Sequence, residues 1–171
     1  MPLRPPCRYA RFPELIVRRW IGALLIAALV SGCGSAARYS IPGDRLDRIR
    51  LLPPVAGTVS SGFGKRAGGH HAGIDILAPA GTEVRAASTG LAEYAGYGKR
   101  GYGNAVILDH GEGITTLYGH LATIRVQSGE TVPAGAVIGT VGRSGNATTH
   151  HLHFELRVDD KAVDPSPYMT R

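Results

Sequence analysis

The sequence predicts an all-β domain, an antiparallel sandwich or partly open barrel of short strands joined by glycine-rich loops. Three observations lead to this fold class. The 171 residues include 24 glycines and 11 prolines but only 6% aromatic residues, a composition typical of many turns. From Leu51 onwards, short β-rich runs alternate with turn residues at regular intervals. Hydrophobic residues make up 43% of the chain, which is enough to bury a core.

The N-terminal 32 residues have the three parts of an export signal. Five arginines lie within residues 1–19 against a single acid, Glu14, and an uninterrupted apolar run follows from Trp20 to Val30. Such a run reaches only about 16 Å as a helix, against roughly 30 Å of bilayer hydrocarbon. A permanent transmembrane helix is therefore the weaker interpretation.

The residues after this run, Val30-Ser31-Gly32-Cys33, resemble the lipobox of bacterial lipoproteins, in which the signal is cut before the cysteine and that cysteine is lipidated. We therefore predict a lipoprotein signal peptide over residues 1–32 and lipidation of Cys33. An ordinary signal peptide cleaved near Ser35 or Ala37 is the alternative. The resemblance implies an exported protein with a lipid anchor in a bacterial membrane.

Removal of this leader changes what the charge and the cysteines indicate. The whole chain has a formal charge of +6, but 14 basic and 12 acidic residues remain after residue 32, a net +2. The indication of a nucleic-acid partner is thereby lost, and we expect none. Cys7 leaves with the leader and Cys33 carries the lipid, so no disulfide is expected. Because Gly34 and not aspartate follows the cysteine, we expect the periplasmic face of the outer membrane if the cell has two membranes.

Residues 33–50 are small and polar, with a break at Pro42-Gly43, and are predicted to form a tether with at most a short helical turn over Asp44–Arg50. Residues 51–171 form the predicted domain. Its expected strands, in order, are Thr58–Ser60, Gly73–Leu77, Glu83–Ala87, Gly90–Tyr94, Ala105–Asp109, Ile114–Tyr118, Ile124–Val126, Val137–Val141 and Leu152–Val158. The glycine-containing turns are expected at 79–81, 96–103, 110–113, 128–130 and 142–146.

The seven histidines of the chain all lie in the domain, and two of them flank a leucine in the last expected strand. Side chains at i and i+2 of a strand share a face, so His151 and His153 point the same way. Their Cβ atoms are expected roughly 6–7 Å apart, which suits two imidazoles on either side of one metal ion and its bound water.

A second pair, His71 and Asp75, is separated by Ala72-Gly73-Ile74. On a straight strand the two polar side chains would be about 13 Å apart, too far to share an ion. We therefore expect a turn at Ala72-Gly73 that leaves His71 on a loop and Asp75 at the start of a strand. Two imidazoles, one carboxylate and a water would make an open zinc site of the catalytic kind.

These residues, with their neighbours, resemble the M23 peptidases, the lysostaphin-like and LytM-like zinc endopeptidases that cut peptides of bacterial cell walls. The resemblance runs from about Pro53 to Tyr168. Its most specific motifs are His71-Ala72-Gly73-Ile74-Asp75, Tyr118-Gly119-His120-Leu121 and His151-Leu152-His153-Phe154-Glu155. It implies the duplicated-hybrid-motif type of fold. One departure is Thr149-His150, where many members have Gly-Pro, which affects the shape of that loop.

The resemblance implies that His71, Asp75 and His153 bind one Zn²⁺, with His120 and His151 beside the metal-bound water. We expect His151 to be the base that helps to activate this water and His120 to stabilise the transition state, although the two roles are exchangeable. Glu155 shares the face of His153 and either orients an imidazole or is a partly exposed strand carboxylate, the interpretation we favour.

The remaining candidates are expected to have no part in the chemistry. We interpret His70 and His150 as bystanders and His110 as a structural residue of a tight turn. Lys65-Arg66 and Lys99-Arg100 lie in glycine-rich loops, where they either meet anionic groups of the wall or are solvated charges, the interpretation we favour.

Three function classes remain in competition. The first is a zinc endopeptidase that hydrolyses peptide cross-links or stem peptides of peptidoglycan. The second is a non-catalytic LytM-like activator of other cell-wall hydrolases, although the loss of ligands that marks this class is absent here. The third is a biotinyl-like carrier, suggested by Gly129–Gly139, which lacks the lysine that such a carrier needs.

Overall fold

The computed structural model describes residues 43–66, 68–98 and 100–170, all of which belong to one compact unit. The predicted signal peptide, Cys33 and the first part of the tether lie outside the described residues. Within the described part of the chain, no helix has the length and apolar character needed to cross a membrane.

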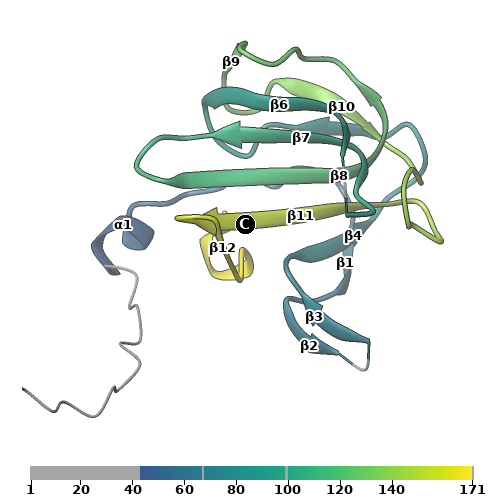
Figure 1. Cartoon of the computed structure of the whole chain (residues 1–171), viewed down its shortest axis with the longest axis horizontal. Coiled ribbons are helices and arrows are strands. Elements are labelled where there is room, and N and C mark those ends of the chain that lie inside the picture. Colours follow the sequence, from purple (N-terminus) through teal and green to yellow (C-terminus); the bar gives the residue numbers. More distant parts are fainter. Residues whose placement is uncertain (1–42, 67, 99, 171) are drawn as a thin grey trace, which may run out of the picture. The chain divides into compact units, whose positions relative to one another are not determined.

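The predicted all-β class is confirmed, and every strand pair is antiparallel. The main path of the large sheet has the order β1-β4-β11-β8-β7-β6-β9, with β12 beside β11, while β10 joins β5 to β8 (Figure 1). The pair β2-β3 forms a separate hairpin. The elements are α1 (Gly43–Asp47), β1 (Thr58–Ser61), β2 (Gly64–Arg66), β3 (Gly69–His71), β4 (Ile74–Leu77), β5 (Glu83–Arg85), β6 (Gly90–Gly98), β7 (Gly103–Asp109), β8 (Ile114–Ile124), β9 (Thr131–Val132), β10 (Val137–Val141), β11 (His151–Val158), β12 (Lys161–Val163) and the 3₁₀ helix η1 (Ser166–Tyr168).

Most expected strands are present, and the differences come from pairing between remote segments. The separate strand expected at Ile124–Val126 is wrong, because β8 runs without interruption to Ile124 and pairs successively with β11 and with β10. The hairpin β2-β3 was not expected, since its residues are polar and glycine-rich and show no alternation. The short strands β9 and β12 carry too few residues for a pattern.

The centre of the large sheet separates an apolar core from a polar face. On β11, Leu152, Phe154 and Leu156 are completely buried in the core. The alternate residues, His151, His153 and Glu155, point to the other face, as period-two alternation requires. They are buried as well, although they are polar. This second face of β11 is where the candidate site lies.

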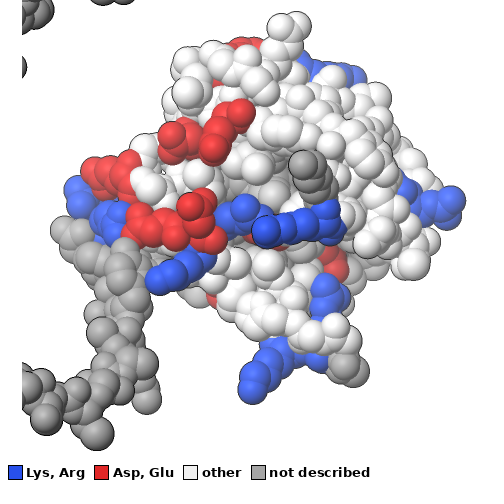
Figure 2. Space-filling view, viewed as in Figure 1, with Lys and Arg blue, Asp and Glu red and all other residues white. Residues whose placement is uncertain are grey.

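The residues that lead into the domain are attached to it. The side chain of Arg45 in α1 forms an ion pair with Asp159 at 2.8 Å, and Ile49 is buried. Leu51 donates its backbone N–H to Tyr168 O at 2.9 Å. The last residues of the expected tether thus contact the end of β11 that is remote from its histidines. Acidic side chains gather near this end, whereas basic ones lie along the middle of the face shown and over the β2-β3 hairpin (Figure 2).

The buried hydroxyl of Tyr118 forms hydrogen bonds within the core, and its removal is expected to lower the stability of the domain. Tyr118, whose burial raises its pKa to about 12, accepts the backbone N–H of Ala87 at 2.8 Å and is hydrogen bonded to Thr116 at 3.0 Å. Tyr118→Phe leaves the N–H of Ala87 unsatisfied and is expected to lower the free energy of unfolding by about 1–3 kcal/mol. Urea denaturation measures this loss. Tyr97→Phe, at an exposed ring, is the control and should change stability by less than about 0.5 kcal/mol; equal losses for both variants would contradict the prediction.

Candidate metal centre

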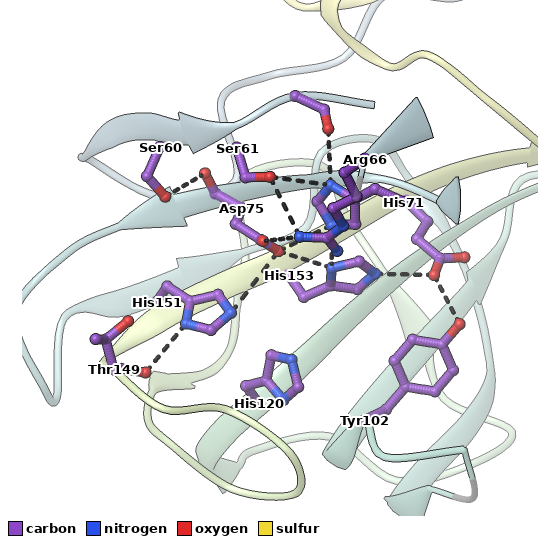
Figure 3. Close-up of polar contacts among 12 residues, drawn as sticks. Ser60, Ser61, Arg66, His71, Asp75, Tyr102, His120, Thr149, His151 and His153 are labelled. Atoms are coloured by element: carbon purple, nitrogen blue, oxygen red, sulfur yellow. Dashed lines mark hydrogen bonds and ion pairs between the residues drawn. The ribbon is translucent and has the colours of Figure 1, made fainter. Parts of the chain in front are cut away.

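Three side chains converge on one point of the polar face (Figure 3). His71 Nε2 lies 3.1 Å from Asp75 Oδ1 and 3.1 Å from His153 Nδ1, and His153 Nδ1 lies 2.8 Å from Asp75 Oδ1. Ligand atoms on a tetrahedral zinc ion are separated by roughly 3.3 Å, since each lies about 2.0–2.1 Å from the metal. His71 and His153 are almost fully buried, while Asp75 is partly open to solvent. The spacing of the three atoms therefore suits a single small cation.

Strand register brings these residues together. Asp75 of β4 is paired directly with His153 of β11, so their side chains leave the sheet on the same face. His71 ends β3, and the Ala72-Gly73 turn folds it back over β4. The expectation of a loop position for His71 is wrong, because β3 pairs with the unforeseen β2. The turn needs glycine, since a Cβ on Gly73 would lie 2.2 Å from Phe154 O.

The protonation of the two imidazoles indicates that the three converging atoms are suited to bind a cation and not to hydrogen bond with one another. His71 Nδ1 lies 2.7 Å from the carbonyl oxygen of Gly62, and His153 Nε2 lies 2.9 Å from Glu155 Oε1. Both partners accept hydrogen bonds, so each neutral ring carries its proton on the outer nitrogen. The inner nitrogens and the carboxylate oxygen then face one another as three acceptors with no proton between them. A bound cation would satisfy all three at once.

A proton shared between Asp75 and His153 can take the place of the cation between these two side chains. Burial alone would raise the pKa of Asp75, but the hydrogen bond to His153 and the charges of the imidazoles lower it. Burial likewise would lower the pKa of His153, but hydrogen bonds to Asp75 and Glu155 raise it. Protons and metal ions therefore compete for the same atoms, as is usual for such ligands.

Two further imidazoles stand beside the three donor atoms. The rings of His120 and His151 lie 4.8 Å apart between centroids, and His120 lies 5.8 Å from the ring of His153. His120 Nδ1 donates to Ser144 O at 2.8 Å, and His151 Nδ1 donates to Thr149 O at 3.0 Å. Each ring is thereby held by one nitrogen and keeps Nε2 for other partners. Burial lowers the pKa of His120.

His120 reaches this position through a local irregularity in β8. Its φ is 62°, a left-handed backbone conformation that is uncommon for a residue other than glycine. The register between β7 and β8 shifts at the same place, as in a β-bulge, and His120 N donates to Tyr102 O at 2.7 Å. Bulges re-aim side chains next to active sites, and strain of this kind clusters at functional positions.

Glu155 is part of a buried network that the sequence did not predict. Its side chain is completely buried; Oε1 accepts from His153 Nε2 and, at 2.7 Å, from the Tyr102 hydroxyl, while Oε2 accepts from Arg157 Nε at 2.7 Å. Burial would raise the pKa of Glu155, but these hydrogen bonds and the charge of Arg157 lower it. The interpretation of Glu155 as a partly exposed carboxylate is therefore wrong. Its period-two spacing from His153 was the available signal, whereas nothing in the sequence indicated Tyr102.

This network predicts an effect on metal affinity. Glu155→Gln replaces one carboxylate oxygen, which accepts hydrogen bonds, with an NH₂ group, which donates them. The carboxylate that accepts from His153 Nε2 is then lost, so the orientation of the His153 ring and the position of its proton are less well fixed. Removing such an outer partner typically weakens metal binding by about 10- to 100-fold, and we expect a loss in this range. Competition with a chromophoric chelator measures the Zn²⁺ affinity without any need for activity. Glu83→Gln, at a half-exposed carboxylate, is the control; equal affinities for both variants would contradict the prediction.

The other histidines stay apart from this centre. His70 is exposed and packs edge-on against Phe63 with 5.0 Å between ring centroids, and His150 is exposed. His110 Nδ1 donates to Thr89 O at 2.8 Å, and its Nε2 is hydrogen bonded to Thr116 Oγ1 at 2.8 Å, so its role is structural, as expected.

A hollow of about 310 Å³ opens over the centre. Besides the histidines and Asp75, it is lined by Arg66, Tyr102 and the loop residues 146–148. Arg100 lines it too, so each of the two pairs of basic residues contributes an arginine. The expectation that Lys65-Arg66 lies in a loop is wrong, because both residues belong to β2, which pairs with β3. Asp75 and His153, with His120 and His151, thus line an open cleft, and His71 adjoins it through its contacts with the first two.

Comparison with known proteins identifies bacterial relatives, among them an outer membrane lipoprotein and a murein hydrolase activator. The profile of peptidase family M23 matches residues 69–165. The chain is 43% identical over 125 residues to DD-carboxypeptidase/endopeptidase Mpg of Neisseria meningitidis serogroup B, covering 68% of this chain and 28% of that protein. The chain is 41% identical over 118 residues to outer membrane antigenic lipoprotein B of Haemophilus influenzae, covering 69% of this chain and 29% of that protein. It is 39% identical over 116 residues to murein hydrolase activator NlpD of Salmonella typhimurium, covering 68% of this chain and 30% of that protein. The match spans less than a third of the length of these three relatives.

Solved structures share the fold. A peptidase M23 structure from Pseudomonas aeruginosa superposes with a TM-score of 0.64 at 38% identity, covering 70% of this chain and 50% of that one. Lysostaphin from Staphylococcus simulans superposes with a TM-score of 0.62 at 34% identity, covering 66% and 48% of the two chains.

Proposed function

Because the chain belongs to peptidase family M23, we propose that it is a zinc endopeptidase that hydrolyses peptide cross-links or stem peptides of bacterial peptidoglycan. The observation that carries this proposal is the convergence of His71, Asp75 and His153 with their inner acceptor atoms within 3.1 Å of one another. A site of three protein ligands in an open cleft is the arrangement of catalytic zinc, whereas structural zinc sites have four.

In the proposed mechanism, His71, Asp75 and His153 would hold the Zn²⁺, and the bound ion would supply Lewis acidity and make a water more acidic. His151 takes a proton within the cleft at Nε2 as the general base and passes it to the leaving amine, and His120, in its form protonated at Nε2, donates a hydrogen bond to the oxyanion that develops on the cleaved carbonyl group. Both rings are held at Nδ1, so either Nε2 suits either role and the roles are exchangeable. Glu155 keeps the proton of His153 on Nε2.

The second candidate is a non-catalytic activator of other cell-wall hydrolases, which a relative named murein hydrolase activator favours. An activator needs no metal centre, so nothing would select for three donor atoms and two held imidazoles. All five residues are present here and line or adjoin one hollow. This completeness supports the enzyme.

We further propose that residues 1–32 are a lipoprotein signal peptide, that Cys33 is lipidated and begins a tether to residue 50, and that residues 51–171 are the peptidase domain. Relatives named as lipoproteins support a lipid-anchored envelope protein. We place it on the periplasmic face of the outer membrane in a cell with two membranes, with peptidoglycan as its substrate and other wall hydrolases as candidate partners.

The test is a digest of purified peptidoglycan by the full chain in detergent, loaded with Zn²⁺. We expect release of muropeptides that a chelator stops and added Zn²⁺ restores. If the zinc-loaded protein and His71→Ala give the same result, the peptidase proposal is wrong. Stimulation of an amidase by both proteins, with no cleavage by either alone, would instead support the activator.

A further inference from the structure

Two arginines give the cleft a charge that the proposed reaction does not use. Arg66 on β2 and Arg100 in the β6-β7 turn both line the hollow over the metal centre. Among the described residues that line it, Asp75 is the only carboxylate, and Asp75 is a proposed zinc ligand. With a divalent ion bound, the cleft therefore has an excess of positive charge. Such a cleft attracts anionic substrates and fixes how they bind.

The topology places the two arginines on opposite sides of the metal centre. The β2-β3 hairpin leads directly into β4, whereas the β6-β7 turn lies beyond β8, and β11 runs between β4 and β8. Basic side chains are seen both along the middle of the face and over the β2-β3 hairpin (Figure 2). The two segments that carry the arginines thus flank the centre, and a peptide lying over the donor atoms would lie between them.

The backbone around Arg100 is held firmly. Arg100 has a φ of 63°, and Gly101 O accepts the N–H of Asn146 at 2.9 Å. The Ser144 hydroxyl accepts the N–H of Asn104 at 2.9 Å, which joins the same turn to the β10-β11 loop at a second point. The turn is therefore clamped to the loop that precedes His151.

The guanidinium group of Arg100, in contrast, forms no hydrogen bond or ion pair within the described part of the chain. The nearby Arg157 differs, because its guanidinium is paired with the buried Glu155. Arg66 Nη1 lies 3.8 Å from Asp75 Oδ2, and its side chain is about half exposed. Arg100 is thus the cation best placed for a partner that arrives with the substrate.

We infer that the cleft selects substrates with a free carboxylate close to the cleaved peptide bond, and that Arg100 binds this carboxylate. The inference rests on the proposed function and specifies its substrate class. Guanidinium groups bind carboxylates through paired, charge-assisted hydrogen bonds that an uncharged carboxamide cannot reproduce. Arg66, which already lies near Asp75, contributes electrostatic attraction for anionic substrates without binding the carboxylate itself. Arg100 also lines a second hollow of about 320 Å³ with Tyr94 and Tyr97, so the carboxylate would lie where the two hollows meet.

The test uses two cross-linked stem-peptide dimers that are identical except that the free carboxylates of one are converted to carboxamides. For the zinc-loaded full chain we expect kcat/KM to be about 10- to 100-fold higher on the carboxylate substrate, the range of a hydrogen-bonded charge pair. Arg100→Gln should remove most of this preference by slowing cleavage of the carboxylate substrate alone. Arg125→Gln, at an exposed arginine outside the hollow, is the matched control and should retain the preference.

Equal cleavage of the two substrates by the unaltered chain would overturn the inference and leave the peptidase proposal intact. An equal loss on both substrates in Arg100→Gln would overturn it too, because Arg100 would then support the fold or the metal centre. If neither substrate is cut, the peptidase proposal fails by itself. Equilibrium binding of the two peptides to the zinc-loaded protein then decides the inference: tighter binding of the carboxylate form that depends on Arg100 supports it, and equal binding refutes it.

Discussion

Asp75→Ala is expected to abolish peptidoglycan cleavage and to weaken Zn²⁺ binding by more than about 100-fold, because loss of an outer partner alone costs about 10- to 100-fold. Asp75 supplies the oxygen that lies 2.8 Å from His153 Nδ1 and 3.1 Å from His71 Nε2. Without it, two imidazole nitrogens remain with no anionic ligand, and one buried ring loses its partner. Two of the four positions of a tetrahedral ion would then be open to water, which binds zinc less firmly than a carboxylate.

Chelator competition and metal analysis of the purified variant measure this effect, and the peptidoglycan digest measures the activity. Glu93→Ala, which removes an exposed carboxylate of β6, is the control and should bind zinc like the unaltered chain. Full zinc content and normal muropeptide release by Asp75→Ala would show that the metal lies elsewhere.

His120→Asn is expected to lower kcat by about 10²- to 10⁴-fold while leaving bound zinc unchanged, the range observed for loss of a group that transfers or donates a proton. Asparagine is chosen because it tolerates a φ of 62° better than alanine does, so the bulge should persist. His120 makes none of the three closest donor contacts, and its ring is held by Ser144 O instead. Its removal should therefore affect the reaction and not the metal.

The measurements are kcat on peptidoglycan, zinc content and thermal unfolding of the same preparations. His151→Ala should give a loss of similar size, and the double variant should lose much less than the product of the two, because residues that act as a unit are not additive. His150→Ala, at an exposed neighbour, should retain full activity. Loss of zinc from His120→Asn would contradict a purely catalytic role.

Much of the polar face was predictable from local pattern. Alternation along residues 151–158 already implied that His151, His153 and Glu155 share a side, because side chains alternate between the faces of any strand. The spacing of His71 and Asp75 implied a turn between them, since a straight strand would separate them too far. What could not be predicted was that Glu155 would be buried, because its burial depends on contacts with Tyr102 of the β6-β7 turn and with Arg157 farther along β11.

The unforeseen elements have a common cause. The β2-β3 hairpin and the part of β8 beyond Tyr118 form by pairing with other segments of the chain, and their own residues carry little β pattern. Context of this kind decides strand formation more strongly than intrinsic propensity does. The position of His71 in a strand is a direct consequence.

By itself, the sequence determined the all-β class, the donors available for a metal and the common face of the histidines on β11, because composition and period-two alternation are local properties. Only the tertiary structure decided that Asp75 pairs with His153, that a bulge turns His120 towards His151, and that Arg100 and Arg66 line the same cleft. These relations depend on the register between strands that are remote in the chain. A shift of one residue in that register would move every side chain of β11 to the opposite face of the sheet.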